Sequence, residues 1–198
     1  MKIITGTARG MNLETLEGEA TRPTTQRVKE AVFSMIQFEV DNTCVLDLFA
    51  GSGQMGLEAL SRGAKKATFC DVSRDAIDIV IRNAKKTKLF DRCRISACDY
   101  NQMIRGLAGK EKYDIIFIDP PYKEKIICGI LRKLINADVM SDGCIIVCES
   151  GYEDIFDGEE DLVYRFEIQK KSKYSVSYIT LLRYKAENNY EGYNDREL

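Results

Sequence analysis

Cys44-Val-Leu-Asp-Leu-Phe-Ala-Gly-Ser-Gly-Gln-Met-Gly56 is the stretch that decides the fold. Its first part, residues 44–49, is the kind of apolar run that forms a buried strand. The glycines that follow have the G-x-G-x-x-G spacing, which lets the chain turn tightly and lets a ligand approach the backbone. Residues 54–62 then have a helical pattern. A strand, a glycine turn and a helix in this order predict one unit of an α/β fold.

Apolar runs and helical patterns continue to alternate on both sides of this stretch. Further strands are expected at residues 67–71, 93–98, 113–119 and 144–149. Further helices are expected at residues 24–38, 75–86 and around 127–134. Strands that alternate with helices in this way predict a parallel sheet that is covered by helices on both faces.

The two ends of the chain have a different character. Residues 161–169 and 177–184 are strand-like, and a polar, basic stretch without a helix joins them. Two strands joined in this way pair more easily in the antiparallel sense. Residues 1–22 are expected to form a short β-hairpin or arm with glycines at its turns. Residues 185–198 are polar and acidic, which is typical of a loose tail.

The composition excludes several classes of protein. The chain has 198 residues, 44% hydrophobic content and a net charge of −2, which is typical of one soluble globular domain. No apolar run is long enough to span a bilayer, and the N-terminal residues lack a signal-peptide core. Seven cysteines and no histidine argue against a disulfide framework or a zinc site. We therefore expect no metal and a reducing, cytoplasmic setting.

Four acids stand at or near the ends of successive predicted strands: Asp47, Asp71, Asp99 and Asp119. In an open α/β sheet these ends line one crevice. Asp71 could accept both hydroxyls of a ribose, Asp99 with Tyr100 could hold and cover an adenine edge, and Asp47 could face an ammonium group. Several carboxylates suit the cationic sulfonium of S-adenosylmethionine, whereas they repel a pyrophosphate. The acids therefore favour S-adenosylmethionine over a dinucleotide.

The second motif is Asp119-Pro-Pro-Tyr122, directly after the apolar run of residues 113–118. The two prolines fix the backbone and donate no N–H, so bare carbonyls lie between a carboxylate and an aromatic ring. Such a loop offers acceptors for an amine and a flat face for a ring. The motif therefore predicts a slot for a planar group that carries an exocyclic amine.

Each of these features also has a plainer explanation. An acid after a strand can simply cap the next helix, a glycine loop can be a structural turn, and Asp-Pro-Pro-Tyr can be a rigid strand exit. The glycine loop alone would also suit a nicotinamide oxidoreductase. That class needs a proton-transfer group, yet the chain has no histidine and no Tyr-x-x-x-Lys pair near the loop. It would also leave the second motif unexplained.

Taken together, the motifs resemble those of a known family. The chain is similar to S-adenosylmethionine-dependent methyltransferases that modify exocyclic amino groups, and more closely to the bacterial 16S rRNA guanine-N2 methyltransferases. The resemblance rests on Arg22-Pro-Thr-Thr-Gln-Arg-Val-Lys-Glu-Ala-Val-Phe33, Leu46-Asp-Leu-Phe-Ala-Gly-Ser-Gly53, Gly56-Leu-Glu-Ala-Leu-Ser-Arg-Gly-Ala64, Asp119–Tyr122 and Lys171-Ser-Lys-Tyr174. The chain departs from the family pattern at Gln26, where an acid is usual, at Asp71 instead of glutamate, and at Ser175 instead of glycine.

The resemblance implies a fold and a division of the chain. It implies a Rossmann-like class I methyltransferase with a seven-stranded, mostly parallel sheet, an antiparallel last strand, helices on both faces and a small N-terminal β-hairpin arm. Residues 1–24 would form an RNA-contacting arm, residues 25–185 the methyltransferase domain and residues 186–198 a polar tail. The implied activity is methylation of a guanine N2 in 16S rRNA. Its substrate is the small ribosomal subunit or a late assembly intermediate, and the enzyme would be a cytoplasmic monomer without a membrane partner.

The resemblance and the chemistry together give the candidate site residues. The catalytic set is Asp119, Pro120, Pro121 and Tyr122, and the S-adenosylmethionine set is Asp47, Phe49, Ala50, Gly51, Ser52, Gly53, Asp71, Asp99 and Tyr100. Candidate RNA phosphate contacts are Arg9, Arg22, Thr24, Arg27, Lys29, Lys171 and Lys173. Two alternatives remain open: N-methylation of adenine or cytosine in DNA, and a catalytically silent ribosome-assembly factor with the same fold.

Overall fold

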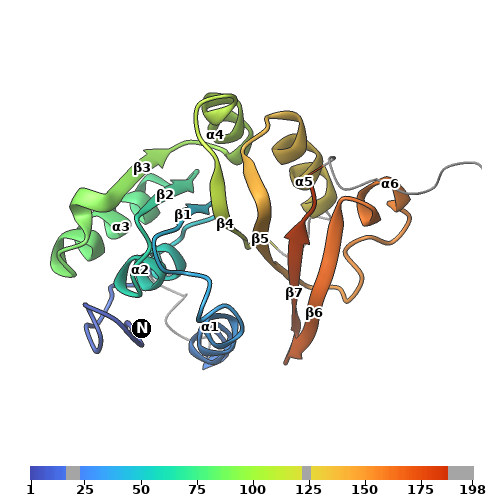
Figure 1. Cartoon of the computed structure of the whole chain (residues 1–198). Coiled ribbons are helices and arrows are strands. Elements are labelled where there is room, and N and C mark those ends of the chain that lie inside the picture. The colour runs from blue at the N-terminus through green and yellow to red at the C-terminus, as the bar shows by residue number, and fades with distance from the viewer. Residues whose placement is uncertain (17–22, 122–125, 187–198) are drawn as a thin grey trace, which may run out of the picture.

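The computed structural model describes residues 1–16, 23–121 and 126–186, and it describes no side chains for residues 23–25 and 160. Within these ranges, seven strands form one twisted sheet with helices on both faces (Figure 1). Three predicted contacts cannot be placed: Arg22 and Tyr122 lie outside the described residues, and so does the side chain of Thr24. The predicted tail also lies outside them, except for Ala186.

The sheet has the strand order β3-β2-β1-β4-β5-β7-β6. Its strands are β1 (Cys44–Asp47), β2 (Lys66–Asp71), β3 (Cys93–Ala97), β4 (Tyr113–Ile118), β5 (Met140–Ser150), β6 (Phe166–Tyr174) and β7 (Ser177–Tyr184). The first five are parallel, and β7 is antiparallel to both of its neighbours. The chain order reverses between β1 and β4, and in open α/β sheets this is where ligands bind, beyond the carboxyl ends of the strands.

Each face of the sheet has its own apolar core, because successive strand residues point to opposite faces. On β4, Ile115 and Phe117 join the core under α1 (Pro23–Met35), α2 (Gln54–Ser61) and α3 (Arg74–Lys86). Ile116 and Ile118 join the core under α4 (Tyr100–Leu107), α5 (Ile127–Asn136) and α6 (Glu160–Val163). One 3₁₀ turn, η1, spans Phe90–Arg92. This arrangement confirms the predicted fold class, including the single antiparallel strand at the end of the described chain.

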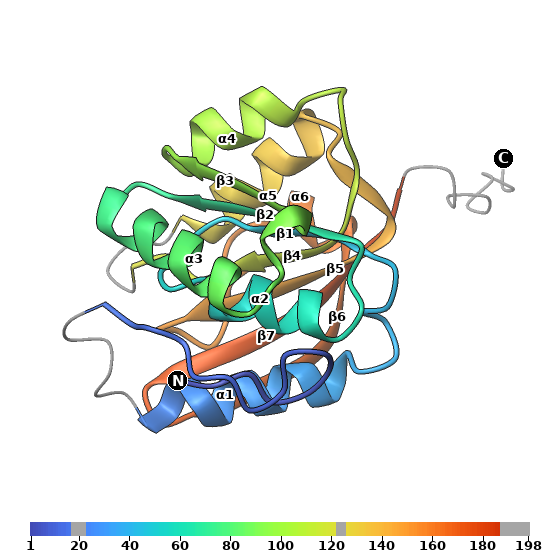
Figure 2. The same ribbon diagram turned by 90° about the vertical axis from the view of Figure 1, so that its left-hand side faces the viewer.

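The N-terminal segment, residues 1–16, is here called the arm, and it runs along α1 (Figure 2). The N–H of Leu13 donates to the carbonyl of Met1 (2.7 Å), and the N–H of Gly10 donates to Ile3 (2.9 Å). The predicted hairpin is present as one antiparallel bridge between Lys2 and Asn12 instead of two regular strands.

The C-terminal part corrects one predicted strand. The structure has a short helix, α6, near the start of the strand expected at residues 161–169, and β6 begins only at Phe166 and continues to Tyr174. Lys171 and Lys173, expected in a linking stretch, therefore belong to the strand. The prediction was wrong because β6 is an edge strand with mostly exposed side chains, so its second half needs no apolar pattern.

Two further features bear on the site. Helix α4 has no counterpart among the predicted elements, although its buried Met103, Ile104 and Leu107 have helical spacing. Within the described ranges, no helix has both the length and the apolar character needed to cross a membrane.

Candidate functional site

The glycine turn lies between β1 and α2 and is held by backbone hydrogen bonds. Gly51 and Gly53 have φ angles of 51° and 78°, in the left-handed region that favours glycine. The N–H of Gly53 donates to the carbonyl of Ala50 (2.7 Å), and the N–H of Ala50 donates to Cys70 on β2 (2.9 Å). At Gly56 a Cβ would lie 2.3 Å from the ring of Phe69, so glycine lets α2 pack closely on β2. The predicted turn is thus a rigid connection.

Asp71, at the end of β2, is oriented by two backbone groups. Its Oδ2 accepts the N–H of Gly51 (2.8 Å), and its Oδ1 accepts the N–H of Ser73 (2.9 Å). A carboxylate oxygen has a second lone pair, so each oxygen can still accept from a ligand hydroxyl. Asp71 therefore shapes the turn and also presents acceptors at its rim.

Asp47, at the end of β1, is only 3% exposed. The N–H of Gly56 approaches its Oδ2 at 3.4 Å. The pKa of Asp47 is raised to about 7, mainly by burial and to a smaller extent by the nearby charge of Asp71, whereas the N–H groups of Gly56 and Phe49 oppose the shift. Removal from water disfavours the charged form of this carboxyl. A cation placed beside it would offset that cost, so binding of a cation here would be strongly favoured.

Asp99 and two aromatic rings lie at the next strand end. Asp99 caps α4, and its Oδ1 accepts the N–H of Asn101 (2.8 Å) and of Gln102 (3.0 Å). The N–H of Gln102, followed by that of Asn101, holds the pKa of this exposed carboxyl below its usual value. The rings of Phe49 and Tyr100 lie 5.6 Å apart. The capping role suggested for such acids is thus real for Asp99.

Val72 was not among the predicted residues, although it directly follows Asp71. Its side chain is 72% exposed, which is unusual for a large apolar residue at a strand end. The sequence signal was available: an apolar residue stands after the acid of the second strand. Together with Phe49 and Tyr100, it places apolar side chains at neighbouring strand ends.

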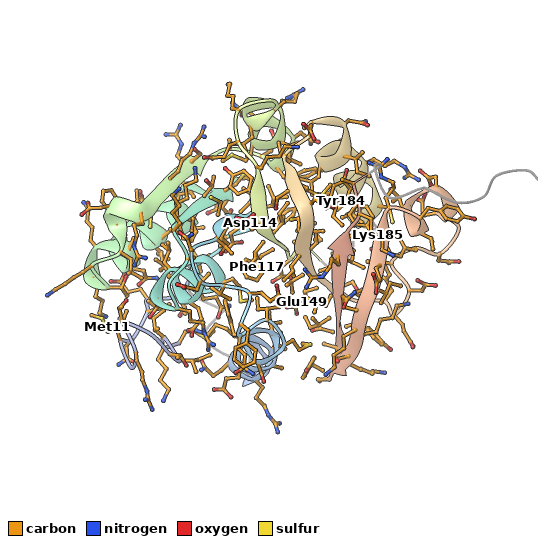
Figure 3. All side chains as sticks on the ribbon, viewed as in Figure 1. Met11, Asp114, Phe117, Glu149, Tyr184 and Lys185 are labelled. Carbon is orange, nitrogen blue, oxygen red and sulfur yellow. The ribbon has the colours of Figure 1, made fainter. Side chains whose placement is uncertain are left out.

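A small pocket lies between α1, the start of α2 and the ends of three strands. It is lined by Val28, Lys29, Val32, Gln54, Met55, Phe117, Ile118, Asp119, Val147, Glu149 and Ile179. Phe117 and Glu149 mark the strand side of this pocket (Figure 3). Gln54 directly follows the glycine turn, and its buried Oε1 has no hydrogen-bond partner. Gln54 was not among the predicted site residues, because a polar residue at a helix start is usually a surface residue.

The pocket brings part of the predicted catalytic segment next to the glycine turn. Asp119 is exposed and lines the pocket, Pro120 is buried, and Pro121 is exposed. The N–H of Leu48, which precedes the turn, donates to the carbonyl of Phe117 (3.2 Å). The backbone before the turn and the backbone before Asp119 are therefore bonded to each other.

The predicted RNA contacts divide into exposed and buried residues. Arg9 is exposed in the arm, and Arg27 is exposed on α1. Lys171 and Lys173 are exposed on β6, where the Nζ of Lys171 lies 3.3 Å from Asp154. Strand register places Lys173 opposite Tyr178, which in turn pairs with Ser150 at the carboxyl end of β5. These two lysines thus approach the same edge of the sheet as the pocket.

The prediction that Lys29 contacts RNA phosphate is corrected by the structure. Its side chain is buried, its Nζ donates to the carbonyl of Lys2 (2.7 Å), and it lies 3.6 Å from the buried carboxylate of Glu58. Glu58 also accepts from Arg62 (2.8 Å). Burial lowers the pKa of Lys29, while the charge of Glu58 raises it. The ammonium group is thus committed to the protein interior and is removed from the candidate phosphate contacts.

The comparisons with known proteins agree with this geometry. The strand order and the turn define a Rossmann-like class I methyltransferase fold, and the solved Escherichia coli structure YhhF shares it. It has a TM-score of 0.82 and 26% identity and covers 94% of this chain and 99% of its own. The family model described as Conserved hypothetical protein 95 matches residues 1–183, so the chain belongs to that family.

Named relatives include methyltransferases of the small-subunit ribosomal RNA, which agrees with the resemblance seen in the sequence. Ribosomal RNA small subunit methyltransferase D of Escherichia coli is 31% identical over 153 residues, which are 77% of this chain and 76% of the relative. Bacillus subtilis YlbH is 37% identical over 154 residues, 77% of this chain and 84% of the relative. A more distant structure, SMU.776, was solved with SAH and shares the fold, with a TM-score of 0.68 and 15% identity over 81% of this chain and 49% of its own.

Proposed function

We propose that the protein transfers the methyl group of S-adenosylmethionine to the exocyclic N2 of a guanine in 16S rRNA. One observation carries this proposal: Asp119 lines the same pocket as Gln54, the residue that follows the glycine turn. β4 pairs directly with β1, so the Asp119 segment and the turn leave the sheet side by side. A donor held at the turn and an amine held at Asp119 would be neighbours.

The residues around the turn fit S-adenosylmethionine. Asp71 offers oriented acceptors for the ribose hydroxyls, and the apolar side chains of Phe49, Tyr100 and Val72 suit an adenine ring. Asp47 lies buried before the turn, where its carboxylate favours the cationic methionine end. When bound, the cofactor supplies an electrophilic methyl group on a sulfonium. Glycines in the turn allow the close approach that this ligand requires.

The nucleobase part rests on Asp119 and the two prolines. The Asp119 carboxylate and the Pro120 carbonyl accept the two hydrogens of the guanine N2, which orients the amine toward the donor. Tyr122 stacks on the base, an interaction worth about 1–3 kcal/mol for an aromatic ring. When the new N–C bond forms, the nitrogen must lose a proton, and Asp119 is the group placed to take it. Holding both reactants in contact lowers the activation barrier by roughly 7–11 kcal/mol.

The RNA is held by basic groups of the N-terminal segment, of α1 and of β6. Arg9 in the arm, Arg27 on α1, and Lys171 and Lys173 on β6 contact phosphates, together with Arg22 and Thr24. Phosphate contacts fix register without reading sequence. The net charge of −2 is small for a nucleic-acid binder, so recognition depends on the shape of the small subunit or of a late assembly intermediate. The enzyme acts there as a cytoplasmic monomer.

The decisive experiment uses labelled cofactor and small subunits that lack the modification. Wild-type protein should label 16S rRNA, and digestion should recover the label as N2-methylguanosine. Asp119→Ala should reduce the rate of transfer by at least a thousandfold and leave the affinity for S-adenosylhomocysteine within a factor of about three. Asp78→Ala, which removes an exposed acid from α3, is the matched control and should keep full activity.

Three results would contradict the proposal. Full activity of Asp119→Ala would remove the proposed role of the carboxylate. Label in DNA instead of rRNA would show that DNA is the substrate and that rRNA is not. No transfer by the wild-type protein to any nucleic acid, with the cofactor bound, would favour a silent assembly factor.

A further inference from the structure

Asn83 on α3 is fully buried, and its amide bonds two segments far apart in sequence. Its Nδ2 donates to the carbonyl of Ser52 in the glycine turn (2.9 Å) and to the carbonyl of Glu14 in the arm (3.0 Å). Its Oδ1 accepts the N–H of Glu14 (2.8 Å). One amide therefore uses both of its donor hydrogens and its acceptor on the backbone of the turn and the arm.

The arm is also fixed near its other end, by the helix that follows the turn. Glu58 on α2 accepts the N–H of Ile4 (2.8 Å) and of Thr5 (3.1 Å). Between these bonds, Gly6 packs so closely on Ser61 that a Cβ would lie 1.7 Å from its carbonyl oxygen. Two helices that flank the glycine turn thus hold the arm at residues 4–5 and at Glu14. The arm is part of the structure around the turn.

We propose that Asn83 is a positioning residue that links cofactor binding to the arm. The carbonyl of Ser52 cannot reorient without disturbing the bonds that Asn83 makes to Glu14, and a change at Glu14 acts on the turn through the same amide. A ligand that fixes the turn therefore also stabilises the arm, and the effect is reciprocal. This inference rests on the proposed function, because it takes S-adenosylmethionine as the ligand of the turn.

The test measures hydrogen exchange of the Glu14 amide and the affinity for S-adenosylhomocysteine. In the wild-type protein the ligand should slow exchange at Glu14 at least threefold. Asn83→Asp keeps an acceptor for the Glu14 N–H but removes both donations to carbonyls. It should weaken ligand binding about tenfold, and the ligand should no longer slow exchange at Glu14.

Two control variants separate this role from general destabilisation. Thr87 caps the C-terminal end of α3, where its hydroxyl donates to the carbonyl of Asn83, so Thr87→Val should lower the melting temperature and keep both ligand affinity and protection at Glu14. Arg82→Ala removes the partially exposed ion pair of Arg82 with the Glu14 side chain (2.8 Å) and should also keep both. Asn83→Asp with wild-type affinity, or with ligand-dependent protection at Glu14, would overturn the inference alone. Failure of the wild-type protein to bind the ligand would overturn the proposed cofactor as well.

Discussion

Asp47 shows how one buried carboxyl can make stability depend on pH. Its pKa is about 7 in the folded protein, against 3.8 for an exposed aspartate. Between these two pH values the folded state keeps a proton that the unfolded state has lost. The folded state is therefore most stable at the acidic end of this window, and the free energy of unfolding declines as the pH rises toward 7.

Asp47→Asn should remove this dependence. Between pH 5 and pH 8 the wild-type protein should lose roughly 2–3 kcal/mol of its free energy of unfolding through this group, and the variant should not. Urea unfolding at a series of pH values measures the difference between the two proteins. If the difference in free energy of unfolding between the wild-type protein and the variant stayed constant over this range, Asp47 would be ionised in the folded protein without a loss of stability.

At the residue scale, the sequence predicts chemistry better than contacts. Asp71 and Asp119 could be placed because the ends of parallel strands meet at one edge of a sheet. Asn83 could not, because its partners Ser52 and Glu14 lie 31 and 69 residues away, and nothing in the local pattern marks a bridging amide. The prediction that Lys29 contacts phosphate was wrong for the same reason, because its buried partner Glu58 belongs to another helix.

At the element scale, α1 carries two basic residues with opposite roles. Lys29 is paired inside the protein with Glu58, and Arg27 is exposed on the same helix. Lys29→Ala should destabilise the protein by roughly 3 kcal/mol, because it leaves a buried carboxylate with less compensation. Arg27→Ala should change stability by less than about 0.5 kcal/mol and weaken binding to the small subunit. Urea unfolding and a binding titration on both variants measure these effects.

The reverse pattern would restore the first interpretation of Lys29. If Lys29→Ala kept full stability and lost affinity for the subunit, its ammonium group would be a phosphate contact after all.

The hairpin of β6 and β7 makes a second prediction at this scale. Lys173→Glu should weaken binding to the small subunit. It should also reduce the slope of the logarithm of affinity against the logarithm of salt concentration by the amount expected for about one phosphate contact, because each contact releases condensed counterions. Lys86→Glu makes the same charge change at the end of α3, toward the opposite edge of the sheet, and should have little effect. Titrations at several salt concentrations measure both slopes. Equal slopes for the two variants would mean that the protein's overall charge, and not this hairpin, attracts the RNA.

At the scale of the whole molecule, ligand binding should appear as global stability. A ligand present at about a hundred times its dissociation constant adds about 2.7 kcal/mol. S-adenosylhomocysteine should therefore raise the melting temperature by roughly 5–10 °C, and NAD should leave it unchanged. Stabilisation by NAD instead would show that the turn binds a pyrophosphate and that the carboxylates around it do not exclude one.

Much of the architecture could be predicted, because periodicity reports burial. Strands β1, β2, β4 and β5 lie in the core, so their apolar runs are clear. Four of the helices follow from apolar spacing and from start signals such as Pro23. Edge strand β6 leaves most of its side chains exposed, so it leaves no apolar pattern. Helix α4 buries Met103, Ile104 and Leu107 at helical spacing, so its pattern was present in the sequence and was overlooked. The sheet order could not be derived from periodicity, since pairing depends on long-range contacts that no local window contains. The antiparallel position of β7 came from the resemblance and from the missing helix before it.

The place of β7 has a consequence for synthesis. This strand is the last of the described elements to leave the ribosome, yet it lies inside the sheet, between β5 and β6. Until residues 177–184 emerge, the nascent chain leaves one side of β5 unpaired, with its backbone N–H and C=O groups open to any extended peptide nearby. During its own synthesis, a protein proposed to modify ribosomes would thus carry an open sheet edge until this strand arrives.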